Sequence, residues 1–431
     1  MKVMGIDIGT TSVGLSVLDR QTRRQVKAET IPGGSFIRTD RPWEKLQKVD
    51  EIEKKVIDAV QELLSEFKDI EAIGLTGQMH GILYIDRKGI CVSPLYTWQD
   101  GRGGRKNFEG KSLTEEIYTK TGIHVYSGYG WVTHLYNQRK NLVPETAASF
   151  CTIADYIGMR LTGRESPLIH SSMAASFGFF DLEKGQFRTD LLKDLGVTGD
   201  ILPDTTTKVA PLGKFRGIPV YTAIGDNQAS VLGAAGREPG SILINMGTGG
   251  QISVISDRNI QISGIETRPF LDENYLLAGA SLCGGRAYAV LENFFRQYGK
   301  AAGIGDCPQY DIMDKILKEA QPEEPLLVRT TFQGTRMHPD MRGSIEGISE
   351  ENFTPAALIN GVLRGMAREL YHMYREISEQ IKLEAPVLAA SGNGIRKNPW
   401  LQKAFEEVFE KKLALSPYIE EAACGAAVSC L

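Results

Sequence analysis

Near its start the chain reads Gly5-Ile6-Asp7-Ile8-Gly9-Thr10-Thr11-Ser12-Val13-Gly14-Leu15-Ser16-Val17-Leu18-Asp19. The second half of the chain contains a matching stretch, Ile244-Asn245-Met246-Gly247-Thr248-Gly249-Gly250-Gln251-Ile252-Ser253-Val254-Ile255-Ser256-Asp257. Each stretch has an apolar strand, a Gly-Thr turn, a second apolar strand and a closing aspartate. Backbone N–H groups of such a turn approach an anion closely, and Thr or Ser hydroxyls add donors. Two copies together predict a two-lobed phosphate clamp, whereas an ordinary hairpin turn explains either copy alone equally well.

Asp7 favours the phosphate interpretation of the first turn. It lies between apolar strand residues, where a carboxylate is costly unless it faces water, a cation or another partner. Mg²⁺ prefers one or two carboxylates together with phosphate oxygens and water. A magnesium ion bound to phosphates is therefore one partner that suits Asp7.

Length and composition set the broad class. At 431 residues the chain suits two or three domains, and its formal net charge of −4, without a basic run, argues against nucleic acid as the principal partner. No stretch reaches the apolar length of a membrane span, and the start of the chain lacks the apolar segment of a secretion signal. The six cysteines form no Cys-x-x-Cys pair, as is typical of reduced thiols. We expect a cytoplasmic protein without nucleic-acid or membrane partners.

The apolar pattern predicts two lobes that share an opening plan. The elements expected in the first lobe are a hairpin over 1–20, a helix over 44–68, strands over 72–76 and 220–224, and a helix over 229–235, with a mixed insertion over 107–204 and a connection over 211–219. Those expected in the second lobe are a hairpin over 241–257, helices near 286–299 and 354–382, a strand over 385–390 and a closing helix after Glu420. A helix stop at 236–240 gives domains over 1–238 and 239–431.

Asp226 is the sharpest single candidate for chemistry. It stands in Gly225-Asp226-Asn227-Gln228, where a strand meets a helix, so its carboxylate and the N–H groups of its neighbours reach the same ligand. The alternative is an N-cap that satisfies a helix starting at Ala229 without any catalysis. Both interpretations fit the isolated motif.

Two further polar groups follow predicted strands of the first lobe. Gln78, Met79 and His80 lie between Gly77 and Gly81, and the His80 ring both donates to and accepts from a polyhydroxylated ligand. A structural, hydrogen-bonded histidine is the alternative.

The second group is Trp98-Gln99-Asp100-Gly101-Arg102. It combines an aromatic face with an amide, a carboxylate and a guanidinium. Its alternative is a buried tryptophan beside a structural Asp–Arg ion pair.

Two glycine-containing segments bear on nucleotide binding. The stretch Ser391-Gly392-Asn393-Gly394 follows a strand and opens a helix, so its backbone admits a purine ring or a phosphate, although a plain strand-to-helix turn fits as well. A Walker-type phosphate loop is absent from Gly110-Lys111-Ser112, because position 105 is Arg rather than Gly. Any nucleotide must therefore be held in another way.

Taken together and in this order, these motifs resemble the FGGY family of carbohydrate kinases, within the actin, Hsp70 and sugar-kinase superfamily. The resemblance extends from the first turn to Ala422-Ala423-Cys424-Gly425-Ala426-Ala427-Val428 at the end. It implies an α/β, two-lobed, actin-like or ribonuclease-H-like ATPase fold with the active site in the cleft between the lobes. It also implies ATP-dependent phosphoryl transfer to a sugar, with Mg²⁺ required, and leaves a homodimer open.

Within the family the chain is most similar to the ketose kinases. Thr76-Gly77-Gln78-Met79-His80-Gly81 is similar to the motif of xylulokinase and sedoheptulokinase, whereas glycerol kinases have an Arg-Glu pair in place of Met79-His80. Gln99 favours the sedoheptulokinase type, because xylulokinases usually have Trp-Asn-Asp there. Two departures from the family pattern bear on nucleotide preference: Asn393 replaces a usual second glycine, and Arg396-Lys397 replaces a region with a common serine.

The resemblance assigns roles to individual residues. Asp226 would accept the hydroxyl proton, and Asp7 with Asp226 would hold Mg²⁺. The residues expected to bind the sugar are Gln78, Met79, His80, Trp98, Asp100, Arg102 and Asn227. The residues expected to bind ATP are Gly9, Thr10, Thr11, Ser12, Gly247, Thr248, Gly249, Gly284, Gly392, Asn393 and Lys397. An ATP-driven chaperone or filament protein, and a non-catalytic sugar sensor, are the alternatives on the same fold, and retention of Asp7 and Asp226 favours the enzyme.

Overall fold

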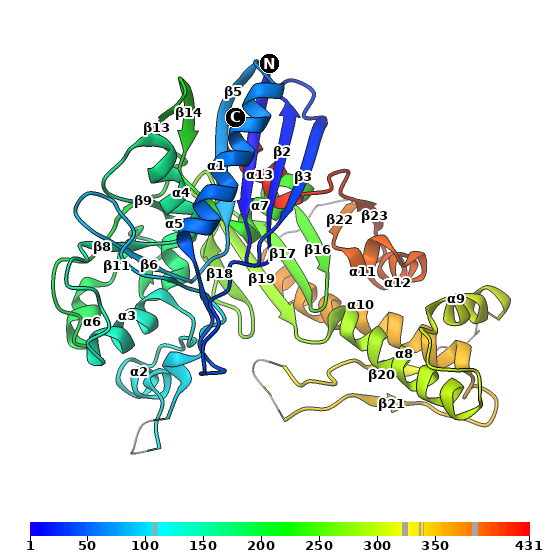
Figure 1. Ribbon diagram of the computed structural model, residues 1–431. Helices are drawn as coiled ribbons and strands as arrows, with labels where there is room; N and C mark the ends of the chain where they lie inside the picture. The colour runs from blue at the N-terminus through cyan, green and yellow to red at the C-terminus, as the bar shows by residue number, and fades with distance from the viewer. Residues whose placement is uncertain (107–109, 321–325, 336–337, 339, 382–386) are drawn as a thin grey trace. The chain divides into compact units, whose positions relative to one another are not determined.

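The computed structural model describes residues 1–106, 110–320, 326–335, 338, 340–381 and 387–431 (Figure 1). The chain forms two compact units. Unit 1 comprises Met1–Gly233, Arg268–Asn274 and Tyr418–Leu431, and unit 2 comprises Ala234–Thr267 and Tyr275–Pro417. The chain thus returns twice to unit 1, and the domain boundary between residues 238 and 239 stays a prediction.

Unit 1 is built on a seven-stranded sheet with the order β13-β14-β5-β1-β2-β3, in which β15 also pairs with β5. Its strands are β1 (Lys2–Ile8), β2 (Ser12–Asp19), β3 (Gln25–Pro32), β5 (Ile70–Gly77), β13 (Pro211–Phe215), β14 (Ile218–Tyr221) and β15 (Ile224–Gly225). Strand β1 runs antiparallel to β2 and parallel to β5. Because Ile8 and Gly225 both pair with Gly77, the carboxyl ends of β1, β5 and β15 meet at one edge of the sheet. Ligands collect at such an edge in open α/β sheets.

Smaller sheets and helices complete unit 1. The short sheets pair β4 (Leu46–Gln47) with β7 (Leu95–Tyr96), β6 (Leu83–Ile85) with β8 (Ser149–Cys151), β9 (Leu168–His170) with β12 (Asp204–Thr206), and β10 (Phe180–Asp181) with β11 (Gln186–Phe187). The helices are α1 (Val49–Glu66), α2 (Leu113–Thr121), α3 (Gly130–Arg139), α4 (Ile153–Thr162), α5 (Ser171–Ala174), α6 (Thr189–Asp194), α7 (Asp226–Ala235) and α13 (Glu421–Ser429).

The two faces of strand β1 have different neighbours, because successive side chains of a strand point to opposite faces. Met4, Ile6 and Ile8 belong to the main hydrophobic core, which also contains Val56 and Val60 of α1. The other face, with Gly5 and Asp7, lies against the C-terminal helix α13, drawn in red among the blue strands in Figure 1.

Glycines allow α13 to approach the sheet closely. Gly5 and Gly74 are partners in neighbouring strands, and a Cβ at either position would overlap the backbone of α13. Gly425 of α13 in turn lies against Ala229 of α7, where a Cβ would overlap the carbonyl oxygen. The last residues of the chain are therefore fixed beside the strand that contains Asp7 and the helix that begins with Asp226.

Unit 2 repeats the opening plan on a six-stranded sheet with the order β18-β19-β17-β16-β22-β23. Its strands are β16 (Ile242–Met246), β17 (Gly250–Ser256), β18 (Glu266–Pro269), β19 (Tyr275–Ser281), β22 (Val387–Ser391) and β23 (Lys412–Leu415), although the last two residues of β18 belong to unit 1. Strand β20 (Leu327–Arg329) pairs separately with β21 (Ser344–Glu346). Its helices are α8 (Gly284–Ala301), α9 (Tyr310–Glu319), α10 (Pro355–Gln380), α11 (Asn393–Arg396) and α12 (Pro399–Phe409). Strand β16 runs antiparallel to β17 and parallel to β22, the relations that β1 has to β2 and β5. The predicted repeat is confirmed.

Several expected boundaries were wrong. The helix expected over 44–68 begins at Val49, because Leu46–Gln47 form strand β4 against β7. The helix expected from Ala229 begins at Asp226, and the expected connection over 211–219 contains β13, which forms a hairpin with β14. Residue 382 of an expected helix, residues 385–386 of an expected strand and residues 107–109 of the expected insertion lie outside the described residues. Among the helices that the structure describes, none has the length and apolar character needed to cross a membrane.

Candidate active site

The first Gly-Thr turn is accessible and tightly folded. Gly9, Thr10 and Thr11 connect β1 to β2, and a Cβ on Gly9 would lie 2.9 Å from the carbonyl oxygen of Ser12. The carbonyl of Thr11 accepts from Gly33 N–H at 2.7 Å, which fixes the outer side of the turn. Thr11 is exposed, and Thr10 and Ser12 are half-buried. The turn has the open backbone that a phosphate site requires.

Asp7 has an unusual environment at the end of β1. Its Oδ1 atom is buried and has no hydrogen-bond partner. Burial, followed by the negative charges of Asp226 and Glu420, raises the pKa of Asp7 to about 8. A carboxylate without a donor and flanked by two others gains from a nearby cation, so these residues fit a magnesium ion accompanied by phosphate oxygens and water.

Asp226 is held by hydrogen bonds around the strand that precedes it. The Thr76 hydroxyl donates to the Ile224 carbonyl at 2.8 Å, and Gly225 N–H donates to the Ser172 hydroxyl at 3.0 Å. Burial raises the pKa of Asp226, whereas the positive charge of Arg268 and a hydrogen bond from Asn227 N–H oppose the rise. Asp226 is the first residue of α7, so the alternative interpretation, an N-cap for a helix starting at Ala229, was wrong.

Arg268 also fixes Asn227, one of the predicted sugar ligands. Its Nη1 donates to Asn227 Oδ1 at 3.1 Å, and the next residue, Pro269, accepts from the Gln228 side chain at 2.9 Å. The segment Arg268–Asn274 belongs to unit 1, far along the chain from α7. The sequence offered no motif that would have identified Arg268.

Glu420 is a second residue that the sequence interpretation missed. Residues Asp7, Gly14 and Thr30 are successive partners across β1, β2 and β3. The Thr30 hydroxyl donates to Glu420 Oε1, and Glu420 Oε2 occupies the space that a Cβ on Gly14 would fill. The available signal was the position of Glu420 directly before α13, the helix that contains the terminal Gly425-Ala426-Ala427 motif.

Gln78, Met79 and His80 follow β5 and lie near Asp226 in the structure. Met79 is buried, and its sulfur lies 2.8 Å from the position that a Cβ on Gly225 would take. Gln78 is also buried and its side chain bonds to Thr10 and Gln47. The carboxyl edge of the sheet therefore brings these residues together with the first turn.

His80 is held in a specific tautomer and an uncommon backbone conformation. Its φ is 72°, and its N–H donates to the Ser176 hydroxyl at 2.9 Å. Nδ1 lies 2.8 Å from the Ser176 carbonyl oxygen, and the ring stacks on Tyr129 at 4.6 Å. Because a carbonyl only accepts, Nδ1 carries the hydrogen, and Nε2 is the acceptor of the neutral ring. Positive φ at a non-glycine residue is a feature that clusters at functional sites.

Trp98 and the Asp100–Arg102 pair differ in their exposure to solvent. Trp98 is 48% exposed, and its Nε1 donates to the Thr10 hydroxyl at 3.0 Å, so the alternative of a buried tryptophan was wrong. Asp100 and Arg102 are buried and bonded to each other, with Nε to Oδ1 at 2.6 Å. Asp100 also accepts from Lys45 N–H at 3.0 Å, and the guanidinium lies 4.2 Å from the Tyr96 ring centroid. This geometry favours the structural ion pair, and a sugar-binding role for Asp100 and Arg102 stays a prediction.

Unit 2 gathers the predicted nucleotide residues around the end of β16. The turn Gly247–Gly249 is exposed, and a Cβ on Gly284 would overlap the backbone of Gly249. Gly285 N–H donates to the Gly247 carbonyl at 3.0 Å, and Arg286 N–H to that of Thr248 at 3.1 Å, so the N-terminus of α8 lies directly against the turn.

A third segment of unit 2 joins this arrangement. Gly392 has a φ of 92°, and a Cβ there would lie 2.6 Å from the Met246 carbonyl oxygen. Asn393 and Lys397, at the start and just after the end of α11, are both exposed. The second turn, the start of α8 and the segment after β22 therefore meet, as expected for loops that bind a nucleotide.

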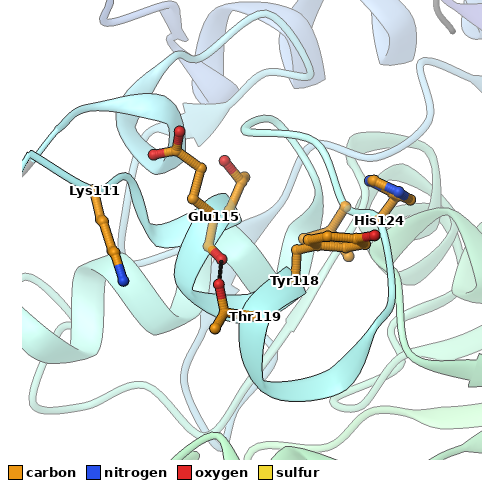
Figure 2. A pocket seen from close by; sticks show the side chains of 7 residues that line it. Lys111, Glu115, Tyr118, Thr119 and His124 are labelled. Carbon is orange, nitrogen blue, oxygen red and sulfur yellow. Dashed lines mark hydrogen bonds between the residues drawn. The ribbon is translucent and has the colours of Figure 1, made fainter.

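Elsewhere in unit 1 a surface hollow of about 380 Å³ lies along α2 (Figure 2). The Tyr118 ring stacks on His124 with centroids 4.1 Å apart, and the Thr119 hydroxyl donates to the Glu115 carbonyl at 2.8 Å. Lys111, from the segment that lacks the glycine of a Walker-type phosphate loop, lines this hollow. The residues predicted to bind the sugar and ATP do not line it.

The family of the chain follows from comparison with known proteins. The N-terminal domain model of the FGGY family of carbohydrate kinases matches residues 2–233, and the C-terminal domain model matches residues 242–431. The chain is similar to sedoheptulokinase from Mus musculus, with 25% identity over 99% of this chain and 96% of that protein. It is similar to gluconokinase from Bacillus subtilis, with 25% identity over 99% of this chain and 86% of that protein. Its fold is similar to the crystal structure of xylulose kinase from Rhodospirillum rubrum, with a TM-score of 0.83, 22% identity, and coverage of 100% of this chain and 89% of that one.

The duplicated strand plan is thus that of a two-domain, actin-like ATPase fold. Both domain models match in order and together span nearly the whole chain. This chain belongs to the FGGY family of carbohydrate kinases and is an ATP-dependent sugar kinase.

Proposed function

We propose that this kinase transfers the γ-phosphoryl group of ATP to a hydroxyl of a ketose, with sedoheptulose as the first candidate. The similarity to sedoheptulokinase over nearly the full length of both chains supports this acceptor. The gluconokinase similarity has the same percentage identity and makes gluconate the second candidate. The sequence motif Gln78-Met79-His80 favours a ketose.

Asp226 is the proposed acceptor of the hydroxyl proton, and its environment carries the proposal. Burial raises its pKa, which makes the carboxylate a better base than an exposed aspartate, while Arg268 opposes the rise and favours the ionised form. Help of this kind contributes about 10² to 10⁴ in rate. Phosphoryl transfer otherwise depends on positioning and on charge neutralisation.

The other residues position the two substrates. Asn227, held by Arg268, and the acceptor nitrogen of His80 would bind sugar hydroxyls, while Trp98 offers an aromatic face to C–H groups. Asp7, together with Asp226, would hold Mg²⁺, which supplies neutralisation of phosphate charge when it is bound. The turns at Gly9–Ser12 and Gly247–Gly249 would bind phosphates, and Gly284, Gly392, Asn393 and Lys397 would surround the rest of ATP.

The decisive experiment measures ADP release from Mg-ATP by the purified full chain with sedoheptulose, xylulose, ribulose, fructose, gluconate and glycerol. We expect one sugar to give strong turnover that falls by at least a hundredfold in Asp226→Asn. Asp204→Asn is the matched control, because Asp204 is an exposed residue of unit 1. Turnover on gluconate alone would replace the ketose assignment, and equal rates in Asp226→Asn and wild type would remove Asp226 from the mechanism.

A further inference from the structure

A continuous set of hydrogen bonds in unit 1 joins the first phosphate turn to the predicted sugar residues. Gln47 Nε2 donates to the Thr10 carbonyl oxygen at 2.8 Å, and Gln78 Nε2 donates to Gln47 Oε1 at 3.0 Å. The Thr10 hydroxyl lies 3.4 Å from Gln78 Oε1 and 3.0 Å from Trp98 Nε1. Gln47 is 1% exposed, lies in β4 and belongs to none of the sequence motifs. We call these four residues the Thr10 relay.

The two ends of the Thr10 relay fix the direction of every hydrogen bond within it. A backbone carbonyl only accepts, so the amide nitrogen of Gln47 faces Thr10 and its oxygen accepts from Gln78. Gln78 consequently turns its oxygen toward the Thr10 hydroxyl. An indole N–H only donates, so Thr10 accepts from Trp98 and gives its own hydrogen to Gln78. This last bond, at 3.4 Å, is the longest in the relay and therefore the weakest.

We propose that the Thr10 relay couples phosphate binding to sugar binding, with Gln47 as its positioning residue; this inference rests on the proposed function. A phosphate oxygen at the turn takes the hydroxyl hydrogen of Thr10. Gln78 Oε1 then loses its donor and accepts a sugar hydroxyl instead, while Trp98 still donates to Thr10. Conversely, a sugar hydroxyl at Gln78 releases the Thr10 hydrogen for the phosphate.

The coupling has a definite sign and size. Because linkage is reciprocal, the nucleotide strengthens sugar binding by the same factor as the sugar strengthens nucleotide binding. One neutral hydrogen bond changes an equilibrium by about two- to tenfold. Gln47 contributes by keeping the Gln78 amide in the orientation that makes the exchange possible.

The first test asks whether the relay is continuous in the ligand-free full chain. Protein labelled with ¹⁵N-tryptophan gives four indole signals, because the chain has four tryptophans, and Trp98→Phe identifies that of Trp98. We expect Gln47→Leu to shift the Trp98 signal through Thr10. Gln309→Leu is the matched control, because Gln309 is a buried glutamine of unit 2 whose side chain donates to the Cys307 carbonyl oxygen. An unchanged Trp98 signal in folded Gln47→Leu overturns the relay, and the other three indole signals report whether that variant has folded.

The second test measures the Kd of sedoheptulose with and without Mg²⁺ and a non-hydrolysable ATP analogue. We divide the Kd without the nucleotide analogue by the Kd with it, so that a larger ratio means stronger coupling. This ratio should be about two- to tenfold smaller in Gln47→Leu and in Thr10→Val than in wild type. Thr10→Ser, which keeps the hydroxyl, and Gln309→Leu should retain the wild-type ratio. Equal ratios in Gln47→Leu, Thr10→Val and wild type would overturn the coupling.

The design separates this inference from the proposed function. If wild type does not bind sedoheptulose, the substrate assignment fails, and the ratio is measured with the sugar that gives the most ADP release. If none of the six compounds of the ADP-release experiment binds, both the acceptor assignment and the coupling are overturned. Binding with a ratio insensitive to Gln47 overturns the coupling alone.

Discussion

Replacing Asp7 by Asn should make the ligand-free protein more stable at high pH. Burial and the charges of Asp226 and Glu420 raise the pKa of Asp7 from 3.8 to about 8. Between these values the folded chain holds a proton that the unfolded chain has released, so stability falls as pH rises through this window. Because Asn does not ionise, the stability of Asp7→Asn does not fall in this way as the pH rises.

The magnitude follows from the size of the pKa shift. Each unit corresponds to about 1.4 kcal/mol, so the full shift sets an upper limit of roughly 6 kcal/mol above pH 8. The Asp7 side chain as a whole is half-buried, and solvent screens part of the interaction. We therefore expect the free energy of unfolding of Asp7→Asn to exceed that of wild type by about 2 kcal/mol at pH 8, which corresponds to a rise in Tm of about 4 to 8 °C. Near pH 4 the gain should almost disappear.

The assay is thermal unfolding followed by circular dichroism from pH 4 to pH 8, in buffers with EDTA. Asp69→Asn provides a control of opposite sign, because a hydrogen bond and ion pair with the Lys2 ammonium lower the pKa of that exposed carboxyl. The interaction of Asp69 with Lys2 stabilises the folded chain above pH 4, and this stabilisation is lost in acid. Asp69→Asn should therefore be slightly less stable than wild type at pH 8. A Tm of Asp7→Asn that does not exceed wild type at pH 8, or a gap that does not shrink toward pH 4, would refute the reasoning.

Two further substitutions test the packing around the site. Gly425→Ala should destabilise unit 1 by about 3 kcal/mol or more, because its Cβ would overlap the Ala229 carbonyl oxygen, whereas exposed Gly104→Ala should be neutral in the same urea titration. Arg102→Met should cost about 3 to 5 kcal/mol of folding free energy, because it leaves Asp100 buried without its partner. A large rise in the sugar KM with unchanged stability would instead make Arg102 a sugar ligand.

The local pattern of the sequence was enough to predict the two hairpins, the turns at Gly9 and Gly247, and the duplicated plan. These features are local: strand alternation, glycine in tight turns and a helix stop are each encoded within a few residues. The helix boundaries at Val49 and Asp226 were less predictable, because β4 and the β15–β5 pairing depend on partners distant in the chain.

The sequence by itself determined which residue types stand at the ends of the strands, and therefore the class of chemistry. Only the tertiary structure decided the burial, the charged neighbours and the hydrogen-bond partners of these residues. It brings Glu420 and Asp226 toward Asp7, buries the Asp100–Arg102 pair and aligns Gln47 with Thr10 and Gln78. The physical reason is that desolvation, charge interaction and hydrogen-bond direction depend on distances between groups that are remote in sequence, which no local pattern specifies.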